Sequence, residues 1–183
     1  MEKVISFMCF IFISSLNGYS QEVSKYYVEI GTSIGIMSLN DSDYELSTRD
    51  LSVSFGYYVS KRFSAKIPFM LSTGLLKNDK LNTKSYDATG AIGLGVGYNF
   101  ILKPTYKIQL SGEVGNTLSK SNDKWSFFYY DAGCKLYLGE TSNRSNAIVG
   151  LGIKQMFFDE KQSTNYLVPY VSIGFRLNSF KRK

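Results

Sequence analysis

The chain has 183 residues, enough for one domain, with 15% aromatic residues, three prolines and a net charge of +6. It contains no histidine, which excludes Ser-His-Asp and Cys-His catalysis and most zinc sites. The basic residues are scattered over the sequence and form no stripe, so we expect no nucleic-acid partner.

The first 20 residues have the pattern of an export signal. Lys3 gives a positive start, an apolar run follows from Val4 to Leu16, and Gly18-Tyr19-Ser20 places small residues where a signal peptidase reads them. Thirteen apolar residues are too few for a membrane anchor, which needs roughly 20. We therefore predict a signal peptide at 1–20, Sec-type export with cleavage between Ser20 and Gln21, and a single mature domain at 21–183.

From Tyr26 onward, apolar and polar residues alternate with a period of two, which indicates strands with two different faces. In the first segment Tyr26, Val28, Ile30, Thr32, Ile34 and Ile36 share the apolar face. The same split recurs seven times, giving predicted strands near residues 26–36, 51–59, 63–72, 86–99, 106–118, 128–138, 147–157 and 167–177. Pro68 and Pro169 interrupt this pattern, and we expect a bulge or kink at each because proline lacks an N–H.

The composition of the second face distinguishes a membrane barrel from a soluble sandwich, which would expose many charges there. That face is rich in Gly, Ser and Thr, as in a narrow lumen packed by side chains. Fourteen glycines lie in the predicted strands, and only Gly90 and Gly112 have the apolar parity. The other twelve have the polar parity: Gly31, Gly35, Gly56, Gly74, Gly93, Gly95, Gly97, Gly115, Gly133, Gly150, Gly152 and Gly174.

The connections also alternate. Longer polar links are expected at 38–50, 76–85, 119–124 and 159–165, and the shortest link is Ser60-Lys61-Arg62. This order is typical of barrels with long external loops and short periplasmic turns. Two aromatic girdles are predicted. The periplasmic one contains Tyr26, Tyr57, Phe63, Tyr98, Phe100, Tyr106 and Phe175, and the outer one Tyr86, Trp125, Phe128, Phe157 and Leu167.

These features resemble the small outer-membrane barrels of the OmpA/OmpX kind and the broader outer-membrane β-barrel, or porin-like, domain family. The resemblance covers Glu22 to about Leu177 and implies an all-β, closed, antiparallel up-and-down barrel of about eight strands. It also implies a Gram-negative outer membrane as the location, with outer-membrane lipid and the barrel-insertion machinery as partners and a monomeric state. The segment Tyr170–Leu177 is similar to the family's terminal insertion signal, with Phe175 or Phe180 as the recognised aromatic residue.

Motifs that suggest chemistry have simpler explanations. Gly93-x-Gly95-x-Gly97 lies within a strand and opens no helix, so lumen spacing accounts for it better than a phosphate loop. Glu113 and Asp131 are a candidate carboxylate pair, but an internal ion network with Lys135 and Lys154 is the stronger interpretation. The acids Asp41, Asp43 and Glu45 lack a calcium loop. We predict no catalytic residue, cofactor or metal.

Eight charged residues share the lumen parity, four acids and four bases, which suggests that they pair. By depth we expect Asp131 to pair with Lys154, and Glu29 with Arg176. The sequence predicts a non-enzymatic barrel with a structural or surface-binding role, in which the four long links meet an extracellular ligand. A small-solute pore is the alternative, and a lipid-acting enzyme a third candidate. The predicted lumen charges are Glu29, Lys66, Asp87, Glu113, Asp131, Lys135, Lys154 and Arg176.

Overall fold

The computed structural model describes residues 25–38, 44–78, 83–118, 125–139, 144–158 and 165–179. The predicted signal peptide, Asp41, Asp43 and Phe180 lie outside these residues. No helix in the described part of the chain is long and apolar enough to cross a membrane. The strands are β1 (Tyr26–Ser38), β2 (Tyr44–Tyr58), β3 (Phe63–Asn78), β4 (Thr83–Leu102), β5 (Tyr106–Thr117), β6 (Phe127–Leu138), β7 (Ser145–Phe158) and β8 (Asn165–Asn178).

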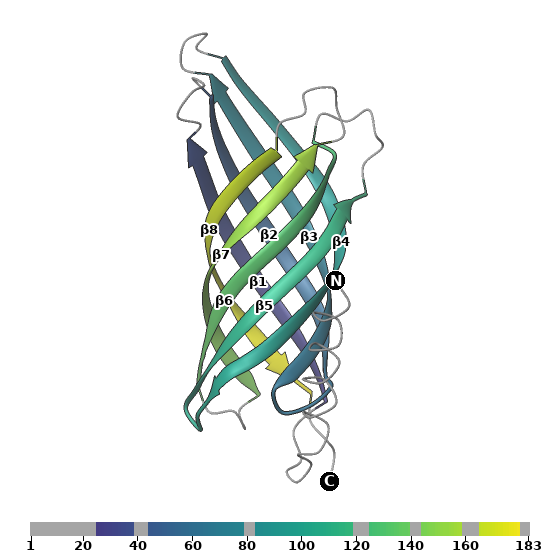
Figure 1. Cartoon of the computed structure of the whole chain (residues 1–183), viewed down its shortest axis with the longest axis vertical. Helices are drawn as coiled ribbons and strands as arrows, with labels where there is room; N and C mark the ends of the chain where they lie inside the picture. Colours follow the sequence, from purple (N-terminus) through teal and green to yellow (C-terminus); the bar gives the residue numbers. More distant parts are fainter. Residues whose placement is uncertain are drawn as a thin grey trace, which may run out of the picture.

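The eight strands form one closed antiparallel barrel in chain order, as the sequence predicts. Figure 1 shows them tilted around a common axis. The barrel closes where β1 pairs with β8, with Glu29 opposite Arg176. We call the end with the connections 59–62, 103–105 and 139–144 the turn end, and the opposite end, where β1 finishes at Ser38, the loop end.

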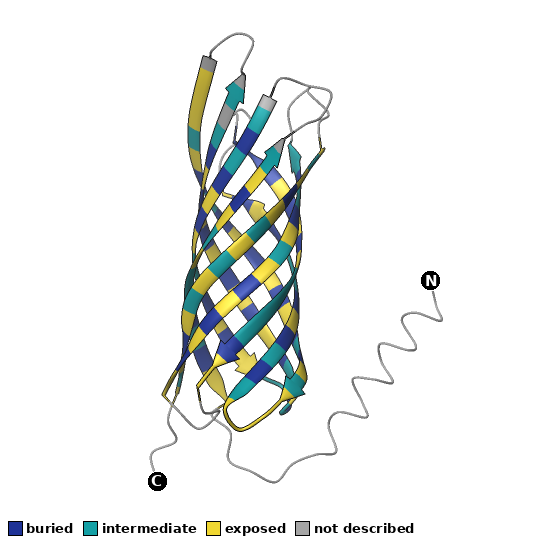
Figure 2. Cartoon of the chain, turned by 90° about the vertical axis from the view of Figure 1, so that its left-hand side faces the viewer, coloured by how far each residue is buried: buried dark blue, intermediate teal, exposed yellow. Residues whose placement is uncertain are grey.

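Exposed and buried residues alternate along the strands, as Figure 2 shows. The period-two pattern has this result because successive side chains of a strand point to opposite faces. Large apolar side chains stay exposed on every strand, including Leu51, Leu94, Leu151, Val171 and Ile173, each more than half exposed. A water-soluble surface rarely carries such a continuous apolar band, whereas a transmembrane barrel requires one.

Two expected links are shorter than predicted because the strands continue. β2 begins at Tyr44, so most of the expected 38–50 link is strand, and the 76–85 link shrinks because β3 extends to Asn78 and β4 starts at Thr83. In this part of β2 the alternation sets buried Leu46 and Thr48 against polar outward residues. The outward residues of these segments form no apolar stripe, because a strand that extends beyond the lipid needs none. The segments were therefore not predicted as strands.

Of the bulge or kink expected at each proline, the bulge is wrong. The β3–β4 register is the same before and after Pro68, and Pro169 keeps its place opposite Ile153. Each residue of an antiparallel ladder directs its N–H and C=O to one neighbour, so a proline removes one bond without needing an extra residue. The register shift in the described ladders lies instead between Asn99 and Ile101 on β4.

Candidate functional site

The lumen is the candidate site, because the buried polar residues of all eight strands meet there. Glycines on the lumen face make room for large neighbours. An added Cβ at Gly56 would lie 2.0 Å from the Tyr27 ring, and one at Gly74 would lie 2.0 Å from Trp125. The two outward glycines, Gly90 and Gly112, have nothing nearer than 3.9 Å. The bias of glycine toward the polar parity therefore reflects limited space inside the barrel.

Glu29 and Arg176 are in contact across the β1–β8 seam. Arg176 is 0% exposed, and its Nε donates to Glu29 Oε1 at 2.7 Å while Nη2 also reaches this oxygen. The hydroxyl of Tyr137 donates to the same oxygen at 2.7 Å and accepts from Arg176 Nη2 at 2.7 Å. A fully buried guanidinium is thus held by a charge-assisted pair and a shared phenol, the arrangement that a desolvated charge requires.

Aromatic rings enclose this pair at the turn end. The guanidinium carbon of Arg176 lies 4.0 Å from the centre of the Tyr27 ring and 4.1 Å from that of Tyr137. Lys107 donates to the Tyr58 hydroxyl at 2.7 Å, and its Nζ lies 4.4 Å from the Tyr137 ring centre. Within the described residues Lys107 forms no ion pair with a carboxylate. Its parity is that of the lumen, but sequence reasoning omitted it from the predicted charges.

A second ion pair lies toward the middle of the lumen. Lys66 Nζ contacts Glu113 Oε1 closely and lies 3.8 Å from Glu29, while Lys135 Nζ is 3.4 Å from Glu29. Lys66, Gly95 and Glu113 occupy one row across β3, β4 and β5. A Cβ at Gly95 would be 3.0 Å from both side chains, so this glycine allows the two charges to meet over β4.

The expected pair between Asp131 and Lys154 is wrong. The two residues are register partners on β6 and β7, but Lys154 Nζ binds Asp50 Oδ2, from β2 on the other side of the lumen. Asp131 accepts instead from the Tyr170 hydroxyl at 2.8 Å. Asp50 was not among the predicted lumen residues because it was placed in a loop. A long lysine in a narrow lumen reaches across the barrel as easily as along its wall.

Asp87 has the lumen parity but lies outside the ion network. It sits on the part of β4 that extends past the end of β5, and its Oδ1 accepts from the backbone N–H of Ala88 at 3.0 Å. Glu113 and Asp131 are register partners on β5 and β6, yet each has its own partner in Lys66 and Tyr170. The described residues contain no cluster of three or more metal-ligating side chains.

A cavity of about 70 Å³ in the lumen is lined by residues of the Glu29 ion cluster and of the Lys154–Asp50 pair. It is lined by both Asp50 and Lys154, and Asp50 Oδ1 has no hydrogen-bond partner among the described residues. A cavity of this size has room for more than one water molecule, and its charged walls supply the partners that water needs. The other charged residues that line it are Glu29, Glu113, Asp131 and Lys135.

An apolar cluster fills the lumen at the loop end. Trp125 was expected in the outer girdle, but it is only 7% exposed and packs inside, with its ring centre 5.2 Å from that of Phe158 and 5.9 Å from that of Phe127. The expectation failed because Trp125 precedes β6, where no alternation assigns a face. The buried members of the cluster are Leu46, Met70, Ala91, Trp125, Phe127, Tyr129, Met156 and Val168.

Comparisons with known proteins find matches among solved structures. No family model and no curated protein matches the chain. A structure from the de novo design of transmembrane β-barrels is 14% identical, covering 88% of this chain and 100% of its own at a TM-score of 0.43. The N-terminal β-barrel domain of Pseudomonas aeruginosa OprF is 16% identical (86% and 100% covered, TM-score 0.45). The translocator domain of the autotransporter NalP from Neisseria meningitidis is 9% identical (97% and 96%, TM-score 0.38).

The closed eight-stranded architecture and the exposed apolar band define the class of the protein. It is a small transmembrane β-barrel, in agreement with the resemblance seen in the sequence.

Proposed function

We propose that the protein is an outer-membrane barrel that binds other proteins at its loop end and conducts no solute through its lumen. The observation that carries this proposal is that the sheet of β2, β3 and β4 extends further at the loop end than the other strands of the barrel do. β4 has 20 residues, whereas a tilted membrane crossing needs about 9 to 11. In Figure 1 the ends of β3 and β4 rise above those of β5 to β8.

Within the described residues, this protruding sheet (residues 44–50 of β2, 73–78 of β3 and 83–90 of β4) has an open edge. β5 pairs with β4 only as far as Ala91 opposite Thr117, after which Leu118 N–H donates to Gly90 O at 2.7 Å. Among the described residues, Lys84, Tyr86 and Ala88 have no strand partner on that side. Backbone groups alternate in direction along a strand, so those of Lys84, Tyr86 and Ala88 face the open edge as Gly90 does.

An open edge is a template for an extended segment of another protein, which adds as a further strand. The hydrogen bond from the Ala88 N–H to the Asp87 side chain occupies one backbone donor of the edge, which limits unwanted strand pairing. Tyr86 is 73% exposed beside it and offers an aromatic contact for the incoming side chains. In outer-membrane barrels the longer connections face the cell exterior and the short turns face the periplasm. This supports assigning the loop end to the cell exterior and the turn end to the periplasm.

The edge is tested with peptides selected from a display library on the folded barrel. Lys84→Pro removes an edge N–H without touching the β3–β4 ladder, and we expect it to weaken a selected peptide about tenfold, the effect of roughly one backbone hydrogen bond. Lys84→Ser, which keeps the N–H, is the matched control and should bind as the wild type does. Selected peptides that bind both variants equally, or that bind the turn end, would contradict edge pairing.

A pore is the alternative function, and electrical recording separates the two. The ion network at the turn end and the apolar cluster at the loop end both occupy the lumen, so we expect the purified barrel to pass no steady current in a planar bilayer. A large and stable conductance would put small-solute transport first. An enzymatic role is not part of the proposal, since the buried carboxylates already have basic or phenolic partners.

A further inference from the structure

In the part of the chain that the structure describes, the rim of the turn end carries exposed charges of one sign. Among the described residues there, the charged side chains that reach the surface are all basic. Lys61 and Arg62 come from the β2–β3 turn, Lys103 from the β4–β5 turn, Arg144 from the start of β7, and Lys25 from the chain before β1. These five bases, which we call the basic rim, come from connections spaced around the barrel. They surround its mouth and do not form one patch.

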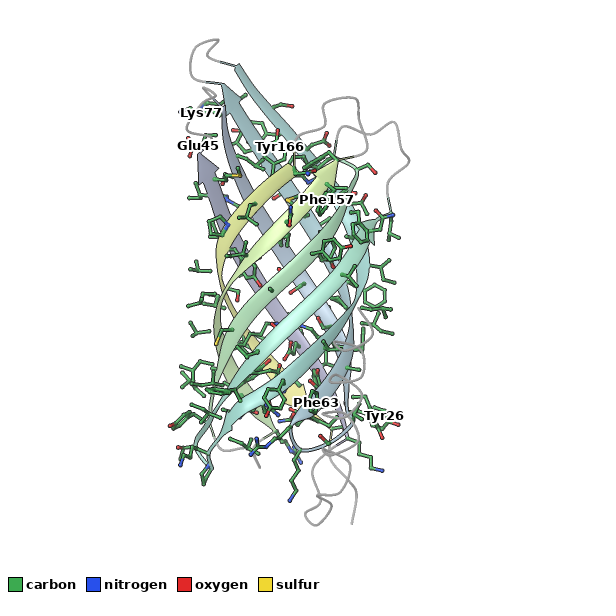
Figure 3. The ribbon with its side chains drawn as sticks, in the orientation of Figure 1. Tyr26, Glu45, Phe63, Lys77, Phe157 and Tyr166 are labelled. Atoms are coloured by element: carbon green, nitrogen blue, oxygen red, sulfur yellow. The ribbon has the colours of Figure 1, made fainter. Side chains whose placement is uncertain are left out.

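The loop end differs in its charge. Its partly or fully exposed charged residues in the described part are Glu45, Arg49, Lys77, Lys84 and Asp87, a mixture of acids and bases. Figure 3 places Glu45 and Lys77 at this end and Tyr26 and Phe63 at the other. Within the described residues the barrel therefore has one basic end and one mixed end, and general solubility does not require such an asymmetry.

Aromatic side chains fix the depth of the basic rim in the membrane. Tyr26 and Phe100 are 62% and 61% exposed just above it, and the rings of Tyr26 and Tyr57 are 5.2 Å apart on the outer wall. Tyr and Trp belts of this kind lie at the level of lipid headgroups. Arg62 Nη1 donates to the Tyr98 hydroxyl at 3.2 Å, which ties the basic rim directly to this belt.

We propose that the basic rim binds the phosphate headgroups of anionic phospholipids in the leaflet at the turn end. Lys and Arg extend their apolar stems along the wall and place their charges among the headgroups, where anionic lipids attract them. The bases are distributed around the circumference and the barrel is already embedded in lipid. A shell of anionic lipid fits this arrangement better than one protein partner, which needs a continuous docking surface.

The test measures which lipids surround the folded protein. The barrel is reconstituted in phosphatidylcholine vesicles with a minority of phosphatidylglycerol, and spin-labelled versions of both lipids report their relative association with the protein. We expect the wild type to prefer phosphatidylglycerol about twofold, a modest effect because the charges are exposed. The double variant Lys61→Gln/Lys103→Gln should lose most of the preference. It leaves the Arg62 contact with Tyr98 in place.

The matched control is Lys77→Gln/Lys84→Gln, which removes two lysines that face each other on the protruding sheet. This control should keep the wild-type preference. A wild type with no preference, an equal loss in both double variants, or an unchanged preference in the rim variant would each overturn the proposal. If the rim variant does not fold, the salt dependence of the wild type tests the proposal instead. A preference for phosphatidylglycerol that persists at about 1 M salt, where charges are screened within about 3 Å, would also overturn it.

Discussion

Replacing Glu29 with glutamine is expected to lower the free energy of unfolding by about 3 to 5 kcal/mol, the cost of removing one partner from a buried ion pair. Glu29 contacts the fully buried Arg176 and lies within 3.8 Å of both Lys66 and Lys135. Without the Glu29 carboxylate, the cations Lys66, Lys135 and Arg176 face each other, and Glu113 is the acid that remains beside them. Urea unfolding in lipid vesicles measures the loss, with the fluorescence of Trp125, the one tryptophan, as the signal.

Glu45→Gln serves as the control, since it removes an acid from the half-exposed protruding sheet, and it should change stability by less than about 0.5 kcal/mol. The double variant Glu29→Met/Arg176→Met should recover much of the loss, because it removes both charges. A small effect of Glu29→Gln alone would mean that water screens Arg176, and it would favour a solvated channel.

Asp50→Asn and Lys154→Met are each expected to destabilise the barrel by about 3 kcal/mol, and the double variant by little more than either alone. The reason is that each charge is buried against the other. The cycle of Asp131→Asn with Lys154→Met is the comparison and should be nearly additive, since Asp131 is held by Tyr170. A stronger coupling of Lys154 to Asp131 than to Asp50 would restore the register pair and contradict the cross-lumen contact.

The glycine pattern shows how far sequence reasoning reached into the site. Parity alone placed Gly93, Gly95 and Gly97 in the lumen, and the structure gives the reason for each. Lys66 and Glu113 meet over Gly95, the Tyr129 hydroxyl lies against Gly93, and the Gln109 amide lies against Gly97. The alternation predicted that space was needed there. Which side chains would use it was not predictable, because they come from other strands of the barrel.

The sequence by itself determined the barrel, the face of almost every strand residue and the meeting of Glu29 with Arg176, because strand period and strand order dictate parity and register. Only the tertiary structure decided that Lys154 binds Asp50, that Trp125 packs inside the loop end and that Asp87 accepts the backbone N–H of Ala88. Parity assigns a side chain to a face but not to a partner on that face. In a closed barrel the inner faces of distant strands meet, so lumen contacts depend on strand length, tilt and side-chain reach, which no local pattern records.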